Sequence, residues 1–327
     1  MRQSSFSETG FEKYRKKTRK EQFLEEMDQI IPWSELVQVI KPFYPAPKGA
    51  GRRPVGIERM LRIHFIQHWF NLSDPSVEEA LYDSRALRSF VEIDLGREPV
   101  PDETTICKFR HLMEKHNLGD QLFHLVNEYL KDNGMKLSQG TIVDASIIHA
   151  PSSTKNSRGE RDPEMRQTKK GNQWYFGMKA HIGVDSRSKL IHSVVATAAN
   201  VHDSQVLADL LHGGETRVWG DSAYAGQKAV ITERSPQAKD FTQTKGSRYR
   251  TLTEQERAAN RHKSRVRAKV EHQFGIIKRQ FGFSKVRYRG LTKNAHRLFV
   301  ACALSNLVMV KKVLLKDKGR KLQGSWV

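Results

Sequence analysis

Three charged residues with helical spacing, Arg267, Glu271 and Lys278, form the most chemically suggestive pattern in this sequence. At about 100° per residue they fall at about 0°, 40° and 20° around one continuous helix, so they share a narrow strip of its surface. The apolar side of the same helix lies directly beside that strip and comprises Val266, Val270, Phe274, Ile277 and Phe281. A lone Glu between two cations is most often an exposed ion pair of neighbouring helical turns. At the edge of a buried face, the same arrangement can instead hold a metal ligand against a phosphate backbone.

Two strand-like segments add aspartates to this pattern. Asp144 interrupts the otherwise apolar or small residues 140–148, and Asp221 stands where a short apolar strand ends and a turn begins. A lone aspartate in a strand is most often a hydrogen-bonded structural residue, but an unpaired one is costly to bury. In α/β folds functional groups gather at the carboxyl ends of strands, where Asp221 is expected.

Together, the carboxylates Asp144, Asp221 and Glu271 predict a site for a pair of hard divalent cations, which take oxygen ligands. Two such ions about 3.5–4 Å apart can activate an attacking oxygen and stabilise a leaving oxygen in phosphodiester chemistry. A zinc site is disfavoured because the histidines of this region lack the spacing of zinc ligands.

The charge of the chain indicates the kind of substrate. There are 56 Lys and Arg against 36 Asp and Glu, which gives a net charge of +20 and a pI near 9.9. A single basic run is more often a solvated face than a binding site, but many such runs make a polyanion the expected partner. The runs lie at residues 13–20, 52–53, 155–170, 245–250, 257–269, 285–289 and 311–321.

Cysteine content and hydropathy restrict the cellular setting. The two cysteines, Cys107 and Cys302, lie in apolar segments that are expected to be helical. Neither a disulfide framework nor a Cys metal site is therefore expected, which suits a reducing cytoplasm. The N-terminal residues lack the apolar segment of a secretory signal. The most apolar run, residues 298–310, has 13 residues and includes Ser305 and Asn306. It is too short to span a bilayer and predicts a buried helix, so no membrane partner is expected.

Residues 20–133 indicate an all-helical region that ends near a division at residue 137. Ser73 and Asp102 are predicted N-caps of two of its helices. The helix after Asp102 begins with polar residues, among them Thr104 and Thr105, that could face a DNA groove as the recognition helix of a helix-turn-helix. An ordinary amphipathic helix explains the same pattern equally well.

The remainder of the chain predicts a mixed α/β sheet flanked by helices. Alternating apolar residues at 174–185, a turn at 186–188 and a second strand at 189–199 predict a hairpin between the two aspartate strands. A helix is expected at 203–211 and a further strand at 241–244. Residues 151–173 are polar and without periodicity, so they predict a mobile loop.

In this order the elements and their motifs resemble the bacterial insertion-sequence DDE transposases of the IS-five group, in the IS-four-like superfamily. The matching text is V-D at Asp144, G-D-S-A-Y at Asp221, R-A-K-V-E-H-Q-F-G-I-I-K around Glu271, W-Y-F-G-M-K-A-H-I-G-V-D from Trp174 and A-N-V-H-D-S through Asn200 to Ser204. The family's helix signature places Arg four residues before the Glu and Lys seven after it, as Arg267 and Lys278 do. It places Tyr three residues before that Arg, where this chain has Ser264.

The resemblance, over about residues 46–312, implies an RNase H-like catalytic domain preceded by an all-α DNA-binding domain. It implies that Asp144, Asp221 and Glu271 hold two Mg²⁺ ions, for which Mn²⁺ can substitute, and that Arg267 and Lys278 contact phosphates near the scissile bond. Weaker candidates for contact with DNA are Tyr224, His181, His202 and Asp203.

The implied enzyme is a transposase. It would bind the terminal inverted repeats of its element as a homodimer on double-stranded DNA, cut the ends, and join the freed 3′-OH to target DNA in the bacterial cytoplasm, at the nucleoid. The expected domains are a basic helical arm (residues 1–45), a helix-turn-helix-like DNA-binding domain (46–137), the catalytic domain (138–312) and a basic tail (313–327). Two alternatives stay open: a metal-dependent nuclease without strand transfer, and a DNA-binding regulator or inactive transposase remnant.

Overall fold

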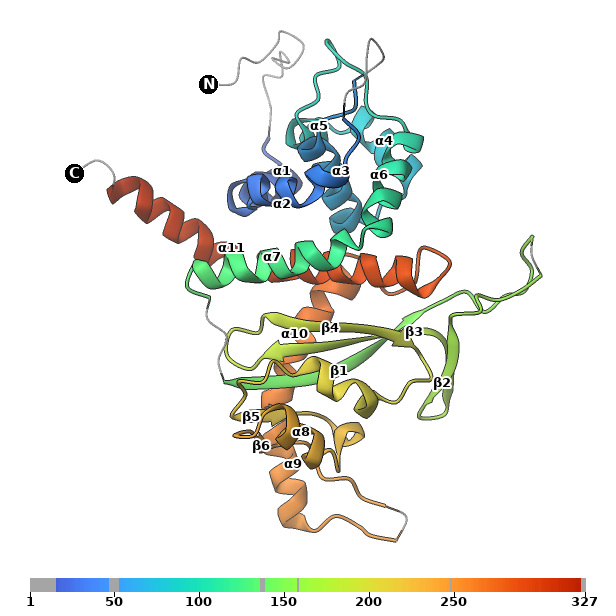
Figure 1. Ribbon diagram of the computed structural model, residues 1–327, viewed down its shortest axis with the longest axis vertical. Helices are drawn as coiled ribbons and strands as arrows, with labels where there is room; N and C mark the ends of the chain where they lie inside the picture. Colours follow the sequence, from blue (N-terminus) through green and yellow to red (C-terminus); the bar gives the residue numbers. More distant parts are fainter. Residues whose placement is uncertain (1–15, 47–52, 136–138, 158, 248, 325–327) are drawn as a thin grey trace. The chain divides into compact units, whose positions relative to one another are not determined.

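The computed structural model describes residues 16–46, 53–135, 139–157, 159–247 and 249–324, the side chains of 318–324 excepted. Within these residues the chain forms two compact units (Figure 1). The first consists of the chain up to Val126 together with the chain from Leu307 onward. The second consists of Asn127–Asn306. Two helices, α7 and α11, therefore contribute residues to both units.

The first unit is helical, as the sequence predicts. Its helices are α1 (Arg19–Ile30), α2 (Trp33–Ile40), the 3₁₀ turn η1 (Lys41–Phe43), α3 (Ile57–Phe70), α4 (Asp74–Asp83), α5 (Arg85–Val91), α6 (Glu103–Lys115) and the first part of α7 (Leu118–Asp132). The two predicted N-caps are confirmed, because Ser73 accepts from the Ser76 N–H and Asp102 accepts from the Thr105 N–H. The core includes Trp69 and Phe65 of α3, whose rings lie 5.9 Å apart.

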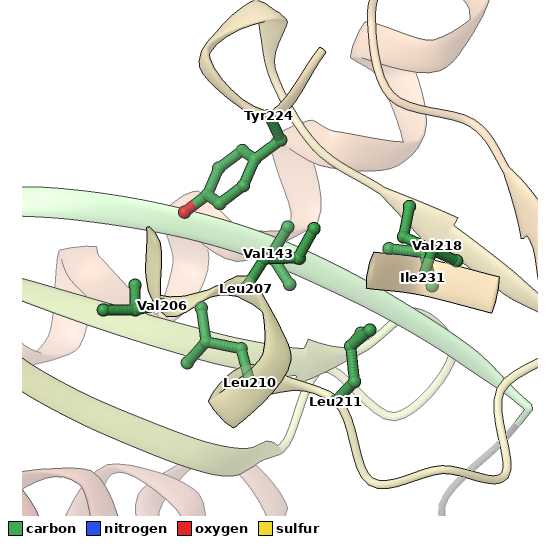
Figure 2. Packing of buried hydrophobic residues seen from close by; sticks show 8 residues of the cluster. All are labelled: Val143, Val206, Leu207, Leu210, Leu211, Val218, Tyr224 and Ile231. Carbon is green, nitrogen blue, oxygen red and sulfur yellow. The ribbon is translucent and has the colours of Figure 1, made fainter. Parts of the chain in front are cut away.

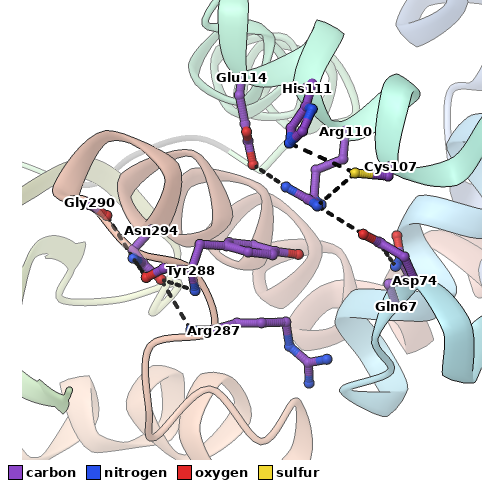
Figure 3. A network of polar contacts seen from close by, with 10 residues as sticks. All are labelled: Gln67, Asp74, Cys107, Arg110, His111, Glu114, Arg287, Tyr288, Gly290 and Asn294. Carbon is purple, nitrogen blue, oxygen red and sulfur yellow. Dashed lines mark hydrogen bonds and ion pairs between the residues drawn. The ribbon is translucent and has the colours of Figure 1, made fainter. Parts of the chain in front are cut away.

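A buried ion pair joins two helices of this unit (Figure 3). The Arg110 guanidinium of α6 donates to Asp74 of α4 at 2.8 Å and to Glu114 at 3.0 Å. Gln67 of α3 donates to the same Asp74 at 2.8 Å. Removing one partner of a buried pair leaves an uncompensated charge, so these contacts fix how α3, α4 and α6 pack within the unit.

The second unit contains a six-stranded mixed sheet in the order β2-β3-β1-β5-β6, with β4 also paired to β3. Its strands are β1 (Gly140–His149), β2 (Arg166–Lys170), β3 (Gln173–Asp185), β4 (Ile191–Ala198), β5 (Arg217–Trp219) and β6 (Lys239–Asp240). The predicted hairpin is present as β3 and β4, which pair antiparallel. The central strand β1 runs antiparallel to β3 and parallel to β5, so both aspartate segments belong to one sheet.

Helical segments lie against both faces of this sheet (Figure 1). One face is covered by the 3₁₀ helix η2 (Asp203–Leu210), the short η3 (Ser222–Tyr224) and α8 (Lys228–Arg234). Figure 2 shows the apolar cluster that holds them there, built from Val143, Val206, Leu207, Leu210, Leu211, Val218, Tyr224 and Ile231. Burying such side chains is the main favourable contribution to folding.

The segment that carries Glu271 is not one regular helix, which corrects the continuous helix assumed for residues 264–281. It consists of α9 (Glu254–Arg267), a 3₁₀ turn η4 (Ala268–Val270), α10 (Glu271–Gly275) and a π-helical turn η5 (Ile276–Gln280). These local changes of winding rotate the side chains away from the even 100° spacing on which the surface strip was drawn. Val270, Phe274, Ile277 and Phe281 are nevertheless buried.

The final helix, α11 (Leu291–Gly324), contains the apolar run that was predicted to be a buried helix. Its residues Leu291–Asp317 are long and apolar enough to cross a membrane by length and composition, yet 61% of the most apolar window is buried in the protein. Asn306 explains the polar interruption, because its side chain accepts from the Ile191 N–H at 2.8 Å and donates to the Ile191 carbonyl at 2.7 Å. The prediction of a buried helix is confirmed.

Two expectations for the sheet region are wrong in detail. The segment 151–173, expected to be a loop throughout, contains strand β2, an exposed strand that pairs with β3 from Arg166↔Gly177 to Lys170↔Gln173. Residues of an exposed strand are mostly polar, so the sequence shows no alternation of apolar and polar positions from which a strand could be predicted. The strand expected at 241–244 is the two-residue β6 (Lys239–Asp240), two residues earlier.

Candidate metal centre

A cavity of about 620 Å³ in the second unit gathers most of the charged residues singled out in the sequence. It is lined by four carboxylates, Asp144, Asp203, Asp221 and Glu271. It is also lined by five cations: Lys169 and Lys170 of β2, Lys179 of β3, Arg267 and Lys278. Six residues named as candidates from the sequence thus line one cavity: Asp144, Asp221, Glu271, Arg267, Lys278 and the weaker candidate Asp203.

Each of the three predicted carboxylates comes from a different element. Asp144 lies on β1 opposite Ile182 of β3 and is 9% exposed. Asp221 follows β5 and caps η3, because its Oδ1 accepts from the Ala223 N–H at 2.8 Å. Glu271 is the first residue of α10. The parallel pairing of β1 with β5 brings the two aspartate segments to neighbouring strands.

The two cations near Glu271 are bonded elsewhere. Arg267 Nη1 donates to Asp144 Oδ2 at 2.9 Å, across from α9 to β1. Lys278 Nζ donates to the Ile147 carbonyl of the same strand at 2.7 Å. Neither cation is therefore paired with Glu271, although the simple alternative of a solvated helix face requires both pairs. Both cations instead tie the helical segment to β1.

Burial dominates the electrostatics of Asp144. It raises the pKa of this carboxyl to about 6, against lowering by the Arg267 guanidinium and the Ala145 N–H, and the neighbouring Asp221 and Glu271 raise it further. One guanidinium therefore compensates only part of the cost of the buried charge. A stronger positive charge beside Asp144 would stabilise the ionised carboxylate.

Two buried donors around the cavity have no acceptor in the part of the chain that the structure describes. They are the hydroxyl of Tyr224, which is fully buried, and Nε of Arg267. Buried polar groups are nearly always hydrogen-bonded, and a bound water or ion is one explanation of an unpaired one. Arg267 lines the cavity, and Tyr224 lies within electrostatic reach of Asp203, Asp144 and Asp221, so an acceptor oxygen bound there could pair with either donor.

The remaining candidates separate into different places. His181 is buried on β3, its Nε2 lies 2.8 Å from Thr197 Oγ1, and burial lowers its pKa to about 4, so it is neutral at pH 7. His202 is exposed and caps η2 through Ser204. Thr104 and Thr105 begin α6 in the first unit, whereas the cavity belongs to the second.

Carboxylate oxygens are the ligands that hard divalent cations prefer, so the donor set of the cavity fits Mg²⁺ or Mn²⁺. Across the described segments, no three His, Cys, Asp or Glu side chains converge closely enough to hold one ion as they stand. Arg267 occupies one oxygen of Asp144 instead. The candidate ligands thus line one cavity, and an ion that binds Asp144 Oδ2 would compete with the Arg267 guanidinium.

Comparison with known proteins identifies the family. Residues 136–307, more than half of the chain, match the family described as Transposase DDE domain. The chain belongs to the DDE transposase family. Residues 12–112 match a second family, described as Transposase domain (DUF772). The matched DDE segment contains the whole cavity.

Membership gives the chain its general activity: it is a transposase, an enzyme of DNA cleavage and transfer that depends on divalent metal ions. Among solved structures, the chain is similar to the piggyBac transposase in a cryo-EM structure of its synaptic complex with hairpin DNA. The identity is 10%, the match covers 90% of this chain and 74% of that chain, and the TM-score is 0.44.

The structure adds site residues that the sequence pattern did not single out. Lys169, Lys170 and Lys179 line the cavity. In the sequence they lie in a polar segment or in an alternating strand pattern, where a lysine usually faces solvent. Ser264, where the family signature has Tyr, accepts from Gln243 Nε2 at 2.6 Å and is not among the residues that line the cavity. Only the pairing of β2 and β3 next to β1 brings the lysines to the carboxylates.

Proposed function

We propose that this chain is an insertion-sequence transposase of the IS-five group, with an RNase H-like catalytic domain, that cuts the ends of its element and joins them to target DNA. One observation carries the proposal: the family's DDE segment gathers Asp144, Asp221 and Glu271 around a single cavity from a strand, a strand end and a helix start. Two aspartates and a glutamate so placed suit metal-dependent phosphodiester chemistry.

In this proposal Asp144, Asp221 and Glu271 hold two Mg²⁺ ions, and Mn²⁺ can replace them. The ions supply Lewis acidity toward the attacking and leaving oxygens. Arg267, once released from Asp144, can fork across two phosphate oxygens, whereas Lys278 acts as a point charge. Lys169 and Lys170 extend the positive wall along which the DNA backbone lies.

The helical first unit is the proposed reader of the terminal inverted repeats, and a homodimer on DNA is the proposed assembly. The net charge of +20 supplies the phosphate attraction that any such complex needs. At the start of α6, however, Asp102 and Glu103 are exposed, and Glu78 accepts from the Glu103 N–H. These carboxylates repel phosphate, and the Thr104 hydroxyl donates to Asp102 Oδ1 at 2.8 Å, so the role proposed for Thr104 and Thr105 is contact with base edges and not with phosphates.

The experiment uses the full chain, Mg²⁺, a DNA fragment that ends in the element's own terminal repeat with a free 3′-OH, and a supercoiled target plasmid. A transposase joins the fragment to the plasmid, and the joined product migrates as a nicked circle or linear species that carries the fragment's label. Glu271→Gln serves as the inactive control. Cleavage of the repeat without joined product would indicate a nuclease, and binding without either reaction would indicate a regulator or an inactive remnant.

A further inference from the structure

Asp203 lines the same cavity as the three proposed metal ligands, and its carboxylate is paired with Lys179. It is the first residue of η2, and its Oδ1 lies 2.8 Å from Lys179 Nζ. Lys179 also donates to the Val201 carbonyl at 2.7 Å. The lysine therefore has two acceptors, of which the carboxylate is only one.

The backbone beside Asp203 is firmly placed. Val206, Leu207 and Leu210 of the same 3₁₀ helix are buried in the apolar cluster against β1 and β5, together with Tyr224 (Figure 2). His202 caps the helix start through the Ser204 N–H at 3.3 Å. Asp203 is thus presented to the cavity from a fixed element, as a ligand-bearing residue needs to be.

Tyr224 supplies a second and independent observation. Its ring packs in the same cluster, and its hydroxyl is fully buried and has no hydrogen-bond partner in the described part of the chain. Burial raises the pKa of this hydroxyl well above its usual value, and the charges of Asp203, Asp144 and Asp221 raise it further, in that order. A buried donor without an acceptor therefore lies near three carboxylates, and an oxygen of water or phosphate held there by a metal ion could accept from it.

We propose that Asp203 is a fourth carboxylate of the metal centre, which binds a divalent cation in place of its contact with Lys179. The inference rests on the proposed function, because it concerns the same cavity. A pair of divalent ions would add four positive charges to a cavity already lined by five protein cations, against which Asp144, Asp221 and Glu271 supply three negative charges. Asp203 adds the fourth negative charge.

The surroundings of Lys179 make the exchange feasible. On release from Asp203 its ammonium keeps the Val201 carbonyl, so it is not left unpaired. Among the described residues, the other basic group within 4.0 Å of Asp203 is His181, whose Nδ1 lies 3.9 Å from Asp203 Oδ1 and which is neutral at pH 7. An incoming ion thus competes with one ammonium. The alternative is that the ion pair of Lys179 with Asp203 only connects β3 to η2 and that Asp203 does not bind metal.

The test is Mn²⁺ binding to the full chain without DNA at pH 8, measured by electron paramagnetic resonance of free Mn²⁺ and by calorimetry. Asp203→Asn keeps the size and a hydrogen-bonding oxygen but loses the charge. Asp209→Asn is the matched control, because Asp209 is an exposed aspartate of the same 3₁₀ helix. We expect Asp203→Asn to weaken binding about tenfold or more, or to remove one bound ion, as loss of a group that supports a metal typically does, while Asp209→Asn leaves binding unchanged.

Two further variants separate the explanations. Lys179→Ala removes the tie between β3 and η2 but frees Asp203, so we expect Mn²⁺ binding to stay the same or become tighter. Weaker Mn²⁺ binding in Lys179→Ala, equal to that of Asp203→Asn, would overturn the inference and show that the Lys179–Asp203 ion pair only connects β3 to η2.

Asp144→Asn tests the proposed function itself. If Asp144→Asn weakens Mn²⁺ binding and Asp203→Asn does not, the fourth ligand is wrong and the three-carboxylate centre stands; if neither changes binding, the centre itself is wrong. Thermal melts without metal verify that each variant is folded.

Discussion

Arg267 Nη1 donates to Asp144 Oδ2 at 2.9 Å, so a protein cation occupies the most buried carboxylate of the proposed metal centre. The pair joins residues 123 positions apart in sequence, one on α9 and one on β1. A guanidinium is a single charge, whereas a divalent ion brings two and accepts several oxygen ligands. In the proposed function, an ion at Asp144 Oδ2 would displace Arg267, which would then be available to a DNA phosphate.

The first prediction follows from this pair. Arg267→Ala removes a phosphate contact but no metal ligand, so cleavage should slow by about 10²–10³, the cost typical of one lost contact to a developing charge. Mn²⁺ binding without DNA should not weaken, because the competing cation is gone. The comparison is Arg265→Ala, an exposed arginine of the same helix turn. Single-turnover cleavage at saturating enzyme measures the rate. Weaker Mn²⁺ binding in Arg267→Ala would contradict the exchange of cations.

A second prediction concerns pH and stability. Burial raises the pKa of Asp144 to about 6 in the folded protein, so the ionised carboxyl destabilises the fold at pH values above that pKa. The cost is absent below about pH 4 and complete above about pH 6, and its upper limit is about 3 kcal/mol for a shift of about two units. Asp144→Asn should therefore melt at higher temperature than the wild type at pH 7.5 in EDTA, with a smaller gain at pH 4.5.

The control for that measurement is Asp209→Asn, which removes an exposed charge and should change the melting temperature equally at both pH values. A gain in Asp144→Asn that is as large at pH 4.5 as at pH 7.5 would show that the buried charge is not its cause. Loss of stability at both values would show that the pair with Arg267 outweighs the burial of the carboxylate.

The third prediction concerns the net charge of +20. Binding to DNA of unrelated sequence should weaken steeply as salt rises, because each Lys or Arg that neutralises a phosphate releases a counterion. We expect a log–log slope of about −4 or steeper by fluorescence anisotropy between low and moderate salt. A flat response would show that the basic runs do not contact DNA.

The fourth prediction assigns sequence reading to the first unit. Thr104→Ala combined with Thr105→Ala should reduce the preference for terminal-repeat DNA over random DNA more than it reduces total binding, since base contacts specify and phosphate contacts position. Competition binding with the two DNAs measures the preference. Lys108→Ala, an exposed cation on the same helix, should lower both affinities alike. An unchanged preference in the double variant would place recognition elsewhere.

That experiment needs the full chain, because α11 contributes to the first unit. Leu307, Val310 and Leu314 are buried there, and Lys311 pairs with Glu26 of α1 and lies 5.2 Å from the ring of Phe23. A fragment limited to the expected helical arm and DNA-binding domain, residues 1–137, would lack these residues of α11. The apolar residues of α11 predict that the helix is buried, but a local sequence pattern does not indicate which part of the chain packs against it.

Other elements show the same division between local and distant information. The hairpin β3–β4 could be predicted, because alternate positions such as Met178, Ala180 and Ile182 are buried and apolar. The changes of winding after Arg267 could not, since nothing in the apolar spacing distinguishes a π-helical turn from an α-helical one. The site was found in part: Asp144 and Asp221 interrupt apolar segments, and Asp203 belongs to a motif of the resembling family, but nothing in the sequence indicates that Lys179 pairs with Asp203.

If Asp144, Asp221 and Glu271 form the metal centre for DNA cleavage, loss of any one of them abolishes cleavage. Cleavage of a terminal-repeat fragment in Mg²⁺ by Asp144→Asn, Asp221→Asn and Glu271→Gln tests this directly. Each variant should bind the fragment as the wild type does and show no cleavage, because each loses a metal ligand while every cation of the cavity stays. Asp209→Asn, outside the cavity, should cut normally. Cleavage at the wild-type rate by any one of the three variants would remove that residue from the centre and contradict the account.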